Sequence, residues 1–303
     1  MEFVDQAAEF LRAGQLVAFP TETVYGLGAN ALDETAVGRV FEVKRRPSER
    51  PLIVHAADTD RALRWATGVD RRAIDLAEAF WPGPLTLVLG RHPHMPARAA
   101  GGHRTIGLRV PDHPMALALL EAAGVPVAAP SANRFGQVSP TRARDVHRAL
   151  GHDVAMVLDG GDCEIGVEST IIGLTTAEPV LLRPGGLSVE AIEQVLGSAV
   201  TLTPNSGEAA PGQSISHYAP RCLVRLVTAA TLAGERQALL DDGLMVAVIE
   251  STGSPDLDAR LLYRRLQEAD EDGADVILAL PPEPIGIGRA VLDRLQRSAA
   301  PRD

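Results

Sequence analysis

The amino-acid sequence predicts an α/β fold: a twisted, mixed sheet with flanking helices, followed by a smaller Rossmann-like α/β domain. Over the first 200 residues, short apolar runs typical of buried strands alternate with amphipathic segments typical of helices. Beyond residue 220 a strand-then-helix pattern repeats three times, which favours a parallel sheet. The stretch between them is rich in Pro, Gly, Ser and Thr. We therefore expect one domain over 1–200, a linker over 201–220 and a second domain over 221–303.

The first domain opens with an acidic amphipathic helix that ends near Gly14. The apolar run after it predicts a strand, and Gly26 and Gly28 let the polar segment that follows turn tightly. Several later helical patterns are preceded by an aspartate that can act as an N-cap. We expect strands at 15–19, 51–54, 85–90, 105–110, 125–129, 154–158, 167–173 and 179–183, and helices at 33–44, 58–66, 70–80, 112–123, 141–149 and from Ser188, the first four of these capped by Asp33, Asp58, Asp70 and Asp112.

The second domain carries no phosphate-binding glycine signature after its first strand. Its glycine-containing segment GIGRAV, at 286–291, stands before the last helix, where glycine is expected only to start that helix. We assign this domain no chemistry. We expect strands at 222–227, 244–249 and 275–280, and helices at 230–240, 257–269 and from about Gly288.

Composition limits the possible functions of the 303-residue chain. Its 46% of hydrophobic residues suffice for a core, but no apolar run approaches the roughly 20 residues of a membrane span. The acidic first helix is unlike a basic secretory leader, so we expect a cytoplasmic protein. The net charge of −10 argues against stable DNA binding. Cys163 and Cys222 have no CxxC partner and are expected to be ordinary thiols, with no protein metal site.

Positive charge nevertheless gathers in one place. Lys44, the only lysine of the chain, is followed by Arg45, Arg46 and Arg50. These side chains can be a solvated helix end that faces the C-terminal dipole, or an anion site. Prolines at 47 and 51 stiffen the segment, and guanidinium groups on a stiff loop suit phosphate oxygens.

A second polar segment, PSANRFGQVSP at 130–140, follows a short predicted strand. Ligands bind at such strand ends in open α/β sheets, although a turn rich in Ser and Asn can also be purely conformational. A serine hydrolase is excluded because no GxSxG elbow surrounds Ser131. His55 and Arg109 end two further strands. A lone histidine there is usually structural, whereas an arginine can hold a carboxylate or form a surface ion pair.

Seven motifs in this order resemble the YrdC family of threonylcarbamoyl-AMP synthases: PTETVYGLGA, KRRPSERPLIVH, WPGPLTLVL, GLRVP, PSANRFGQVSPT, GVESTII and LRPG. The later PGQSISHYAP and the α/β segment after it resemble the long, two-domain members. The resemblance implies synthesis of threonylcarbamoyl-AMP and pyrophosphate from L-threonine, bicarbonate and ATP, with Mg²⁺ held chiefly by the phosphates. The product would pass to a tRNA threonylcarbamoyl transferase complex for tRNA modification.

The resemblance also implies two sets of contacts. Threonine would be bound by Thr23, His55, Arg109, Ala129 and Ser169, and ATP by Lys44, Arg46, Arg50, Thr105, Ser131, Ser139, Arg183 and Tyr218. No side chain is expected to act as a nucleophile.

Tyr218 lies in the linker, where Pro211 and Gly212 admit a bend. It can therefore belong to a lid over the nucleotide or simply dock the domains.

Arg50 departs mildly from the family, which often has lysine or asparagine there. An RNA-binding module that uses the basic cleft remains the main alternative function. A carbamoyltransferase of the same fold is less favoured, because its cysteine-rich and acylphosphatase-like segments are absent.

Overall fold

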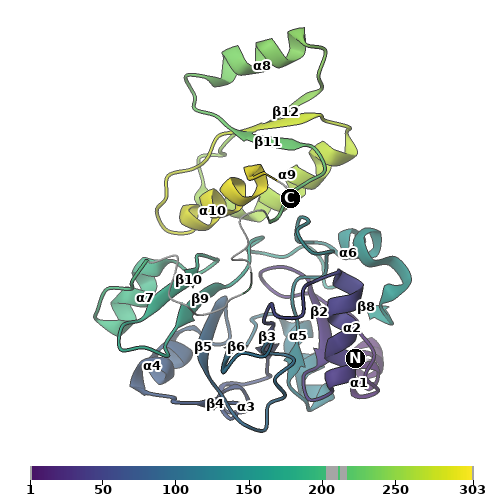
Figure 1. Cartoon of the computed structure of the whole chain (residues 1–303), viewed down its shortest axis with the longest axis vertical. Coiled ribbons are helices and arrows are strands. Elements are labelled where there is room, and N and C mark those ends of the chain that lie inside the picture. The colour runs from purple at the N-terminus through teal and green to yellow at the C-terminus, as the bar shows by residue number, and fades with distance from the viewer. Residues whose placement is uncertain (1, 203–210, 212–216, 302–303) are drawn as a thin grey trace.

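The computed structural model describes residues 2–202, 211 and 217–301. Figure 1 shows a larger α/β body with a smaller α/β layer above it. Most of the expected linker 201–220, including Gly212, lies outside the described residues. The α/β class with a twisted, mixed main sheet is confirmed.

The larger body is built on a ten-stranded sheet, whose main path runs β10-β9-β5-β6-β3-β7-β2-β1-β8 with β4 paired to β5. Three of its strand pairs are parallel, β3 with β6, β5 with β9 and β1 with β8, and the others are antiparallel. The strands are β1 (Val17–Phe19), β2 (Gly26–Asn30), β3 (Ile53–His55), β4 (Ala66–Thr67), β5 (Leu85–Arg91), β6 (Thr105–Arg109), β7 (Val127–Ala128), β8 (Met156–Val157), β9 (Thr170–Gly173) and β10 (Val180–Arg183).

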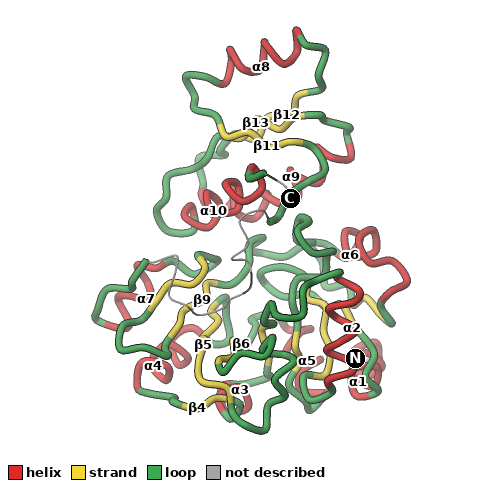
Figure 2. Tube along the Cα trace, in the orientation of Figure 1, coloured by secondary structure: helices red, strands yellow, loops and turns green. Residues whose placement is uncertain are grey.

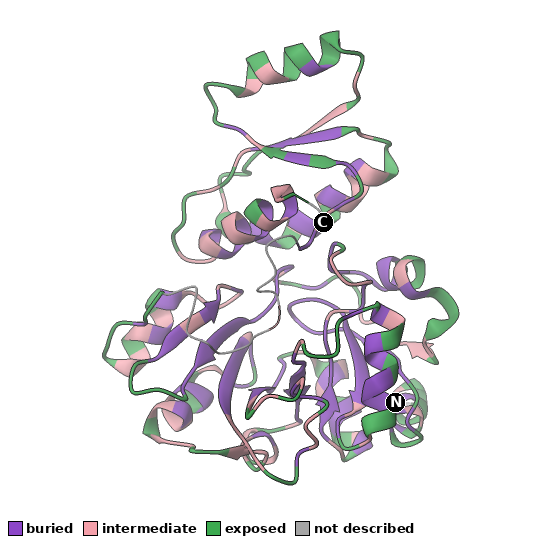
Figure 3. Cartoon of the chain, viewed as in Figure 1, coloured by how far each residue is buried: buried purple, intermediate pink, exposed green. Residues whose placement is uncertain are grey.

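Helices lie around this sheet (Figure 2), and most of its strand residues are buried (Figure 3). Apolar side chains of the strands and helices form shared buried clusters. Asp33, Asp58 and Asp70 cap helices as expected, and Ser188 caps a further helix, because each side chain accepts a hydrogen bond from the first turn. The helices are α1 (Glu2–Arg12), α2 (Glu34–Lys44), α3 (Thr59–Leu63), α4 (Arg71–Phe80), α5 (Pro114–Ala123), α6 (Ala143–Leu150), the 3₁₀ turn η1 (Gly151–Asp153) and α7 (Val189–Leu196).

Two local expectations are wrong. Asp112 does not cap α5: His113 does, because Pro114 occupies the first helical turn and so fixes the start one residue later. The segment after β1 is not only a turn, since Gly26–Asn30 forms β2. Gly28 is needed inside this strand because a Cβ atom would lie 2.9 Å from the ring of Phe19.

The smaller layer has a parallel three-stranded sheet in the order β11-β13-β12, flanked by three helices. α9 and α10 lie between this sheet and the larger body, while α8 lies on the far side (Figure 1). Side chains of α9 and α10 share an apolar cluster with Val24, Val138 and Val167 of the larger body. The elements are β11 (Leu223–Leu226), α8 (Leu232–Asp241), β12 (Val246–Ile249), α9 (Pro255–Glu271), β13 (Val276–Ala279) and α10 (Gly288–Ala299).

Candidate functional site

A pocket lies where several strands of the large sheet end. β3 and β6 are parallel neighbours, and His55 and Arg109, the last residue of each, are paired in register. Nine of the thirteen predicted site residues line the pocket; their ligand contacts stay predictions. The lining residues are Thr21, Thr23, Val24, Gly26, Arg46, Ile53, His55, Arg109, Ala129, Pro130, Ser131, Glu168, Ser169, Arg183, Pro211, His217 and Tyr218.

One wall combines a histidine with an ion pair. Arg109 Nη2 lies 2.6 Å from Glu22 Oε1, and both side chains are almost completely buried. The pair is not aligned as a hydrogen bond, so Nη2 has no hydrogen-bond partner among the described residues. His55 Nδ1 is likewise buried without one. Burial, and then the charge of Arg109, lower the pKa of His55 to about 3, so its imidazole is neutral at physiological pH.

Buried polar atoms without partners are rare in native proteins and need an explanation. Here one of them, His55 Nδ1, belongs to a side chain that lines the pocket. A second, His217 Nδ1, belongs to another lining residue, and burial lowers the pKa of His217 to about 3. A polar ligand in the pocket would supply the missing partners.

Hydroxyl groups also line the pocket. Thr23 Oγ1 lies 2.8 Å from Thr21 Oγ1, which donates to the carbonyl of Val24. Ser169 Oγ lies 2.8 Å from Thr86 Oγ1. All these hydroxyls are buried, so the pocket can hydrogen-bond an alcohol or a carboxylate that water does not reach.

Two lining arginines have no carboxylate in contact among the described residues. Arg46 Nη2 donates to the carbonyl of Pro51 at 3.0 Å, and Arg183 Nη2 donates to the carbonyl of Ser169 at 2.8 Å. Burial and then the charge of Arg50 lower the pKa of Arg46 to about 10, and burial also lowers that of Arg183. Because carbonyls fix these guanidinium groups without neutralising them, the pocket retains positive charge that suits an anion.

Lys44 does not line the pocket. Its buried amino group donates to the carbonyls of Ser131, at 2.5 Å, and of Asn133. Asn133 in turn donates to the carbonyls of Arg134 and Gln137. Lys44 and Asn133 therefore hold the loop that carries Ser131, and the contact of Lys44 with ATP stays a prediction.

Three other predicted ATP contacts do not line the pocket. Thr105 is at the opposite end of β6 from Arg109. Arg50 is half-buried, and its carbonyl accepts a hydrogen bond from Arg46 Nε at 3.4 Å. Ser139 lies between β7 and α6, where its hydroxyl donates to Glu168 Oε1 at 2.7 Å. Their roles stay predictions.

Tyr218 lines the pocket and also packs between the larger body and the smaller layer. Its ring is buried, stacks on Tyr263 of α9 and lies under the guanidinium of Arg294 of α10. Both earlier interpretations, lid and domain docking, are compatible with this position, because a docked tyrosine can also wall the cavity.

Three residues of this site were missed by the sequence interpretation: Glu22, Glu168 and His217. Each stands inside a motif beside a predicted contact, in PTETVYG, GVEST and SHYAP. An acidic residue next to an apolar strand was the available signal for both glutamates, because a buried carboxylate needs a cationic partner.

Among the described residues, no three His, Cys, Asp or Glu side chains gather as a metal site, and both cysteines are buried. No helix in the described ranges is long and apolar enough to cross a bilayer.

Comparisons with known proteins extend over nearly the whole chain. A model of the Sua5, YciO and YrdC proteins, described as "Telomere recombination", matches residues 9–185, and a model described as "Threonylcarbamoyl-AMP synthase, C-terminal domain" matches residues 187–300. The chain is 44% identical over 319 residues to the threonylcarbamoyl-AMP synthase of Pyrococcus abyssi, which covers 98% of this chain and 94% of that protein.

The threonylcarbamoyl-AMP synthase of Bacillus subtilis is 39% identical over 323 residues, covering 99% of this chain and 93% of the relative. The crystal structure of P. abyssi Sua5 complexed with L-threonine matches with a TM-score of 0.92 at 42% identity, over 98% of this chain and 94% of that one. These findings confirm the resemblance stated from the motifs. The chain belongs to the Sua5/YciO/YrdC family, in the long form that carries the C-terminal domain of threonylcarbamoyl-AMP synthases.

Proposed function

We propose that this protein is an L-threonylcarbamoyladenylate synthase, which forms threonylcarbamoyl-AMP and pyrophosphate from L-threonine, bicarbonate and ATP. The observation that carries the proposal is a single buried pocket that joins two kinds of wall. Arg46 and Arg183 offer fixed, unneutralised charge to phosphates, while His55, Arg109 and Ser169 offer donors and hydroxyls to an amino acid. Full-length relatives with the same activity in their names, and a relative bound to L-threonine, support it.

In this reaction the amino group of threonine is first carboxylated by bicarbonate, which forms a carbamate and releases water. An oxygen of this carbamate then attacks the α-phosphate of ATP, and pyrophosphate leaves. The protein's task is to hold the reactants in line and to stabilise the negative charge that develops on the leaving phosphates. Arg109 would hold the threonine carboxylate, and Arg46 and Arg183 would contact the phosphates. No residue needs to form a covalent intermediate.

Mg²⁺ would accompany ATP. Phosphate oxygens and water would hold the ion, as is usual for Mg²⁺ bound with a nucleotide. The ion would neutralise phosphate charge, and the arginines would supplement it.

Three further statements belong to the proposal. The enzyme class is a nucleotidyltransferase, because AMP is transferred to a carboxylate. The unstable adenylate would be passed to a tRNA threonylcarbamoyl transferase complex. We also propose a cytoplasmic location.

Pyrophosphate release tests the proposal. The purified chain should release pyrophosphate from ATP only when L-threonine and bicarbonate are both present, and omission of either should abolish release. Release that does not depend on threonine would contradict it.

The alternative, an RNA-binding module, is not favoured, because the fixed cations lie in a narrow, buried pocket of an acidic chain rather than on an open basic surface.

A further inference from the structure

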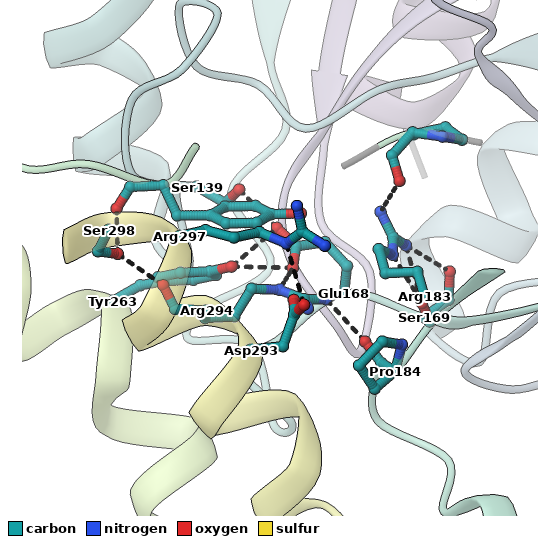
Figure 4. A network of polar contacts seen from close by, with 12 residues as sticks. Ser139, Glu168, Ser169, Arg183, Pro184, Tyr263, Asp293, Arg294, Arg297 and Ser298 are labelled. Atoms are coloured by element: carbon teal, nitrogen blue, oxygen red, sulfur yellow. Dashed lines mark hydrogen bonds and ion pairs between the residues drawn. The ribbon is translucent and has the colours of Figure 1, made fainter. Parts of the chain in front are cut away.

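Glu168, a residue of the pocket wall, is held by the C-terminal layer. Its carboxylate accepts hydrogen bonds from Tyr263 of α9, at 2.9 and 3.1 Å, and from Arg294 Nε of α10 at 2.8 Å (Figure 4). Ser139 donates to the same carboxylate at 2.7 Å. Glu168 and Arg294 are 126 positions apart in sequence, and neither side chain is more than 8% exposed.

The same arginine reaches two other parts of the site. Arg294 Nη2 donates to the carbonyl of Pro184, the neighbour of Arg183, at 2.9 Å. Its guanidinium also lies 4.9 Å from the centre of the Tyr218 ring, and Ser298 of α10 donates to the carbonyl of Tyr218 at 2.9 Å. One side chain from α10 therefore touches three segments that wall the pocket.

Backbone packing also links the segment before Glu168 to α9. Gly166 has φ +82°, and a Cβ atom on it would lie 2.5 Å from the Cα of Arg260 in α9. Only glycine allows this approach. The amides of Ile165 and Gly166 donate to the carbonyls of Glu22 and Thr23. The segment before Glu168 is thus fixed between α9 and the first loop of the pocket.

Stability alone is a weak reason for this ion pair, because a buried pair costs desolvation energy that well-packed apolar residues would avoid. The ion pair also determines the charge in the pocket wall. Burial raises the pKa of Glu168, but the charges of Arg294 and Arg183 outweigh burial and lower it to about 2, so the carboxylate is ionised. An ionised carboxylate in the wall of a phosphate site repels its ligand unless a cation neutralises it.

We propose that Arg294 and Tyr263 are positioning residues of the active site: they neutralise and orient Glu168, so that the nucleotide meets only the positive charge of Arg46 and Arg183. The C-terminal layer is then a structural part of the nucleotide pocket. This inference rests on the proposed function for the identity of the nucleotide, ATP.

The test measures the dissociation constant of ATP by calorimetry in four full-length forms: parent, Arg294→Met, Glu168→Gln and the double variant. Arg294→Met removes the cation that hydrogen-bonds Glu168, so its charge is opposed only by the more distant Arg183, and ATP should weaken about tenfold, with KM for ATP changing more than kcat. In the Glu168→Gln background the same substitution should change the constant less than about threefold, because no charge remains to be neutralised.

Arg289→Met is the matched control. Arg289 is on the same helix and also pairs with the larger body, through Glu190 at 3.2 Å, but that pair is partly exposed and does not line the pocket. It should leave ATP affinity within about twofold of the parent. Equal effects of Arg294→Met and Arg289→Met, or equal effects of Arg294→Met in both Glu168 backgrounds, would overturn the inference.

Tyr263→Phe is a second variant, to be used if the Arg294→Met protein does not fold. This substitution keeps the aromatic ring and removes only the hydroxyl that contacts Glu168. ATP should weaken about two- to fivefold in this variant, and not in combination with Glu168→Gln. No change in either background would overturn the inference. If the parent binds ATP but releases no pyrophosphate with threonine and bicarbonate, the proposed function fails while the affinity pattern still decides the role of Arg294.

Discussion

Glu22 and Arg109 form a buried ion pair at 2.6 Å beside the last residue of β3. Its two partners have separable roles, because Arg109 lines the pocket and Glu22 does not. Arg109→Met leaves the Glu22 carboxylate buried without a counter-charge and should lower the free energy of unfolding by about 3 kcal/mol.

The double variant Arg109→Met/Glu22→Gln is the control for that experiment. It should regain most of the stability, because no buried charge is left unpaired, yet bind L-threonine as weakly as Arg109→Met does. Denaturant unfolding and threonine calorimetry measure the two quantities. Threonine affinity that returns together with stability would show that Arg109 is a structural residue only.

Arg46 and Arg50 should differ in their contributions to ATP binding. Arg46 lines the pocket and is buried, so Arg46→Met should weaken ATP by about 1.5–3 kcal/mol through loss of a charged hydrogen bond. Arg50 does not line the pocket, and Arg50→Met should cost less than about 1 kcal/mol. Calorimetric titrations of both folded variants compare them. Equal losses would mean that the pocket extends to Arg50 when the nucleotide is bound.

His55 should make stability depend on pH. Its pKa is about 3 in the folded protein, mainly through burial, against an ordinary value near 6.5. Between these pH values the His55 side chain binds a proton in the unfolded chain but not in the folded chain. The contribution of neutral, buried His55 to the free energy of unfolding is therefore fully present above about pH 6.5 and is lost progressively as the pH is lowered. At pH 5 the loss from His55 should be about 2 kcal/mol.

Urea unfolding of the parent and of His55→Gln at pH 5 and pH 7 measures this contribution. The variant should lose less stability between the two pH values than the parent loses. The exposed His94→Gln serves as the control. A pH dependence in His55→Gln as steep as in the parent would contradict the neutral, buried state of His55.

Amino-acid selectivity should depend more on the hydroxyl of threonine than on its methyl group. The buried hydroxyls of Thr23 and Ser169 can pair with an alcohol, and a site built to bond a hydroxyl strongly rejects ligands without one. Loss of a methyl costs only about 1–3 kcal/mol. Serine should therefore compete better than valine or 2-aminobutyrate in pyrophosphate release. Valine turnover as fast as that of threonine would remove the threonine assignment.

The sequence predicted most helices and strands, because caps such as Asp33 and Ser188 and the apolar periodicity are local signals. It did not predict β2. Glycines there satisfy close packing against Phe19, and glycine weakens the strand pattern.

The site was predicted less completely. Motif residues such as His55 and Arg46 reach the pocket, but Thr105 does not. The pairing of Glu168 with Arg294 could not be read from the chain, since the two residues are far apart in sequence and meet only when the layers pack. We assigned the second domain no chemistry because its sequence has no nucleotide-binding motif. The absence of such a motif does not indicate whether side chains of this domain contact the pocket of the other.

The identity of the product tests the central claim most directly. The protein should be incubated with ATP, L-threonine and isotopically labelled bicarbonate, and the adenylate analysed by mass spectrometry. We predict an adenylate that carries both threonine and the bicarbonate label, formed together with pyrophosphate, and none when threonine is omitted. An unlabelled threonyl-adenylate, or no adenylate at all, would contradict the account.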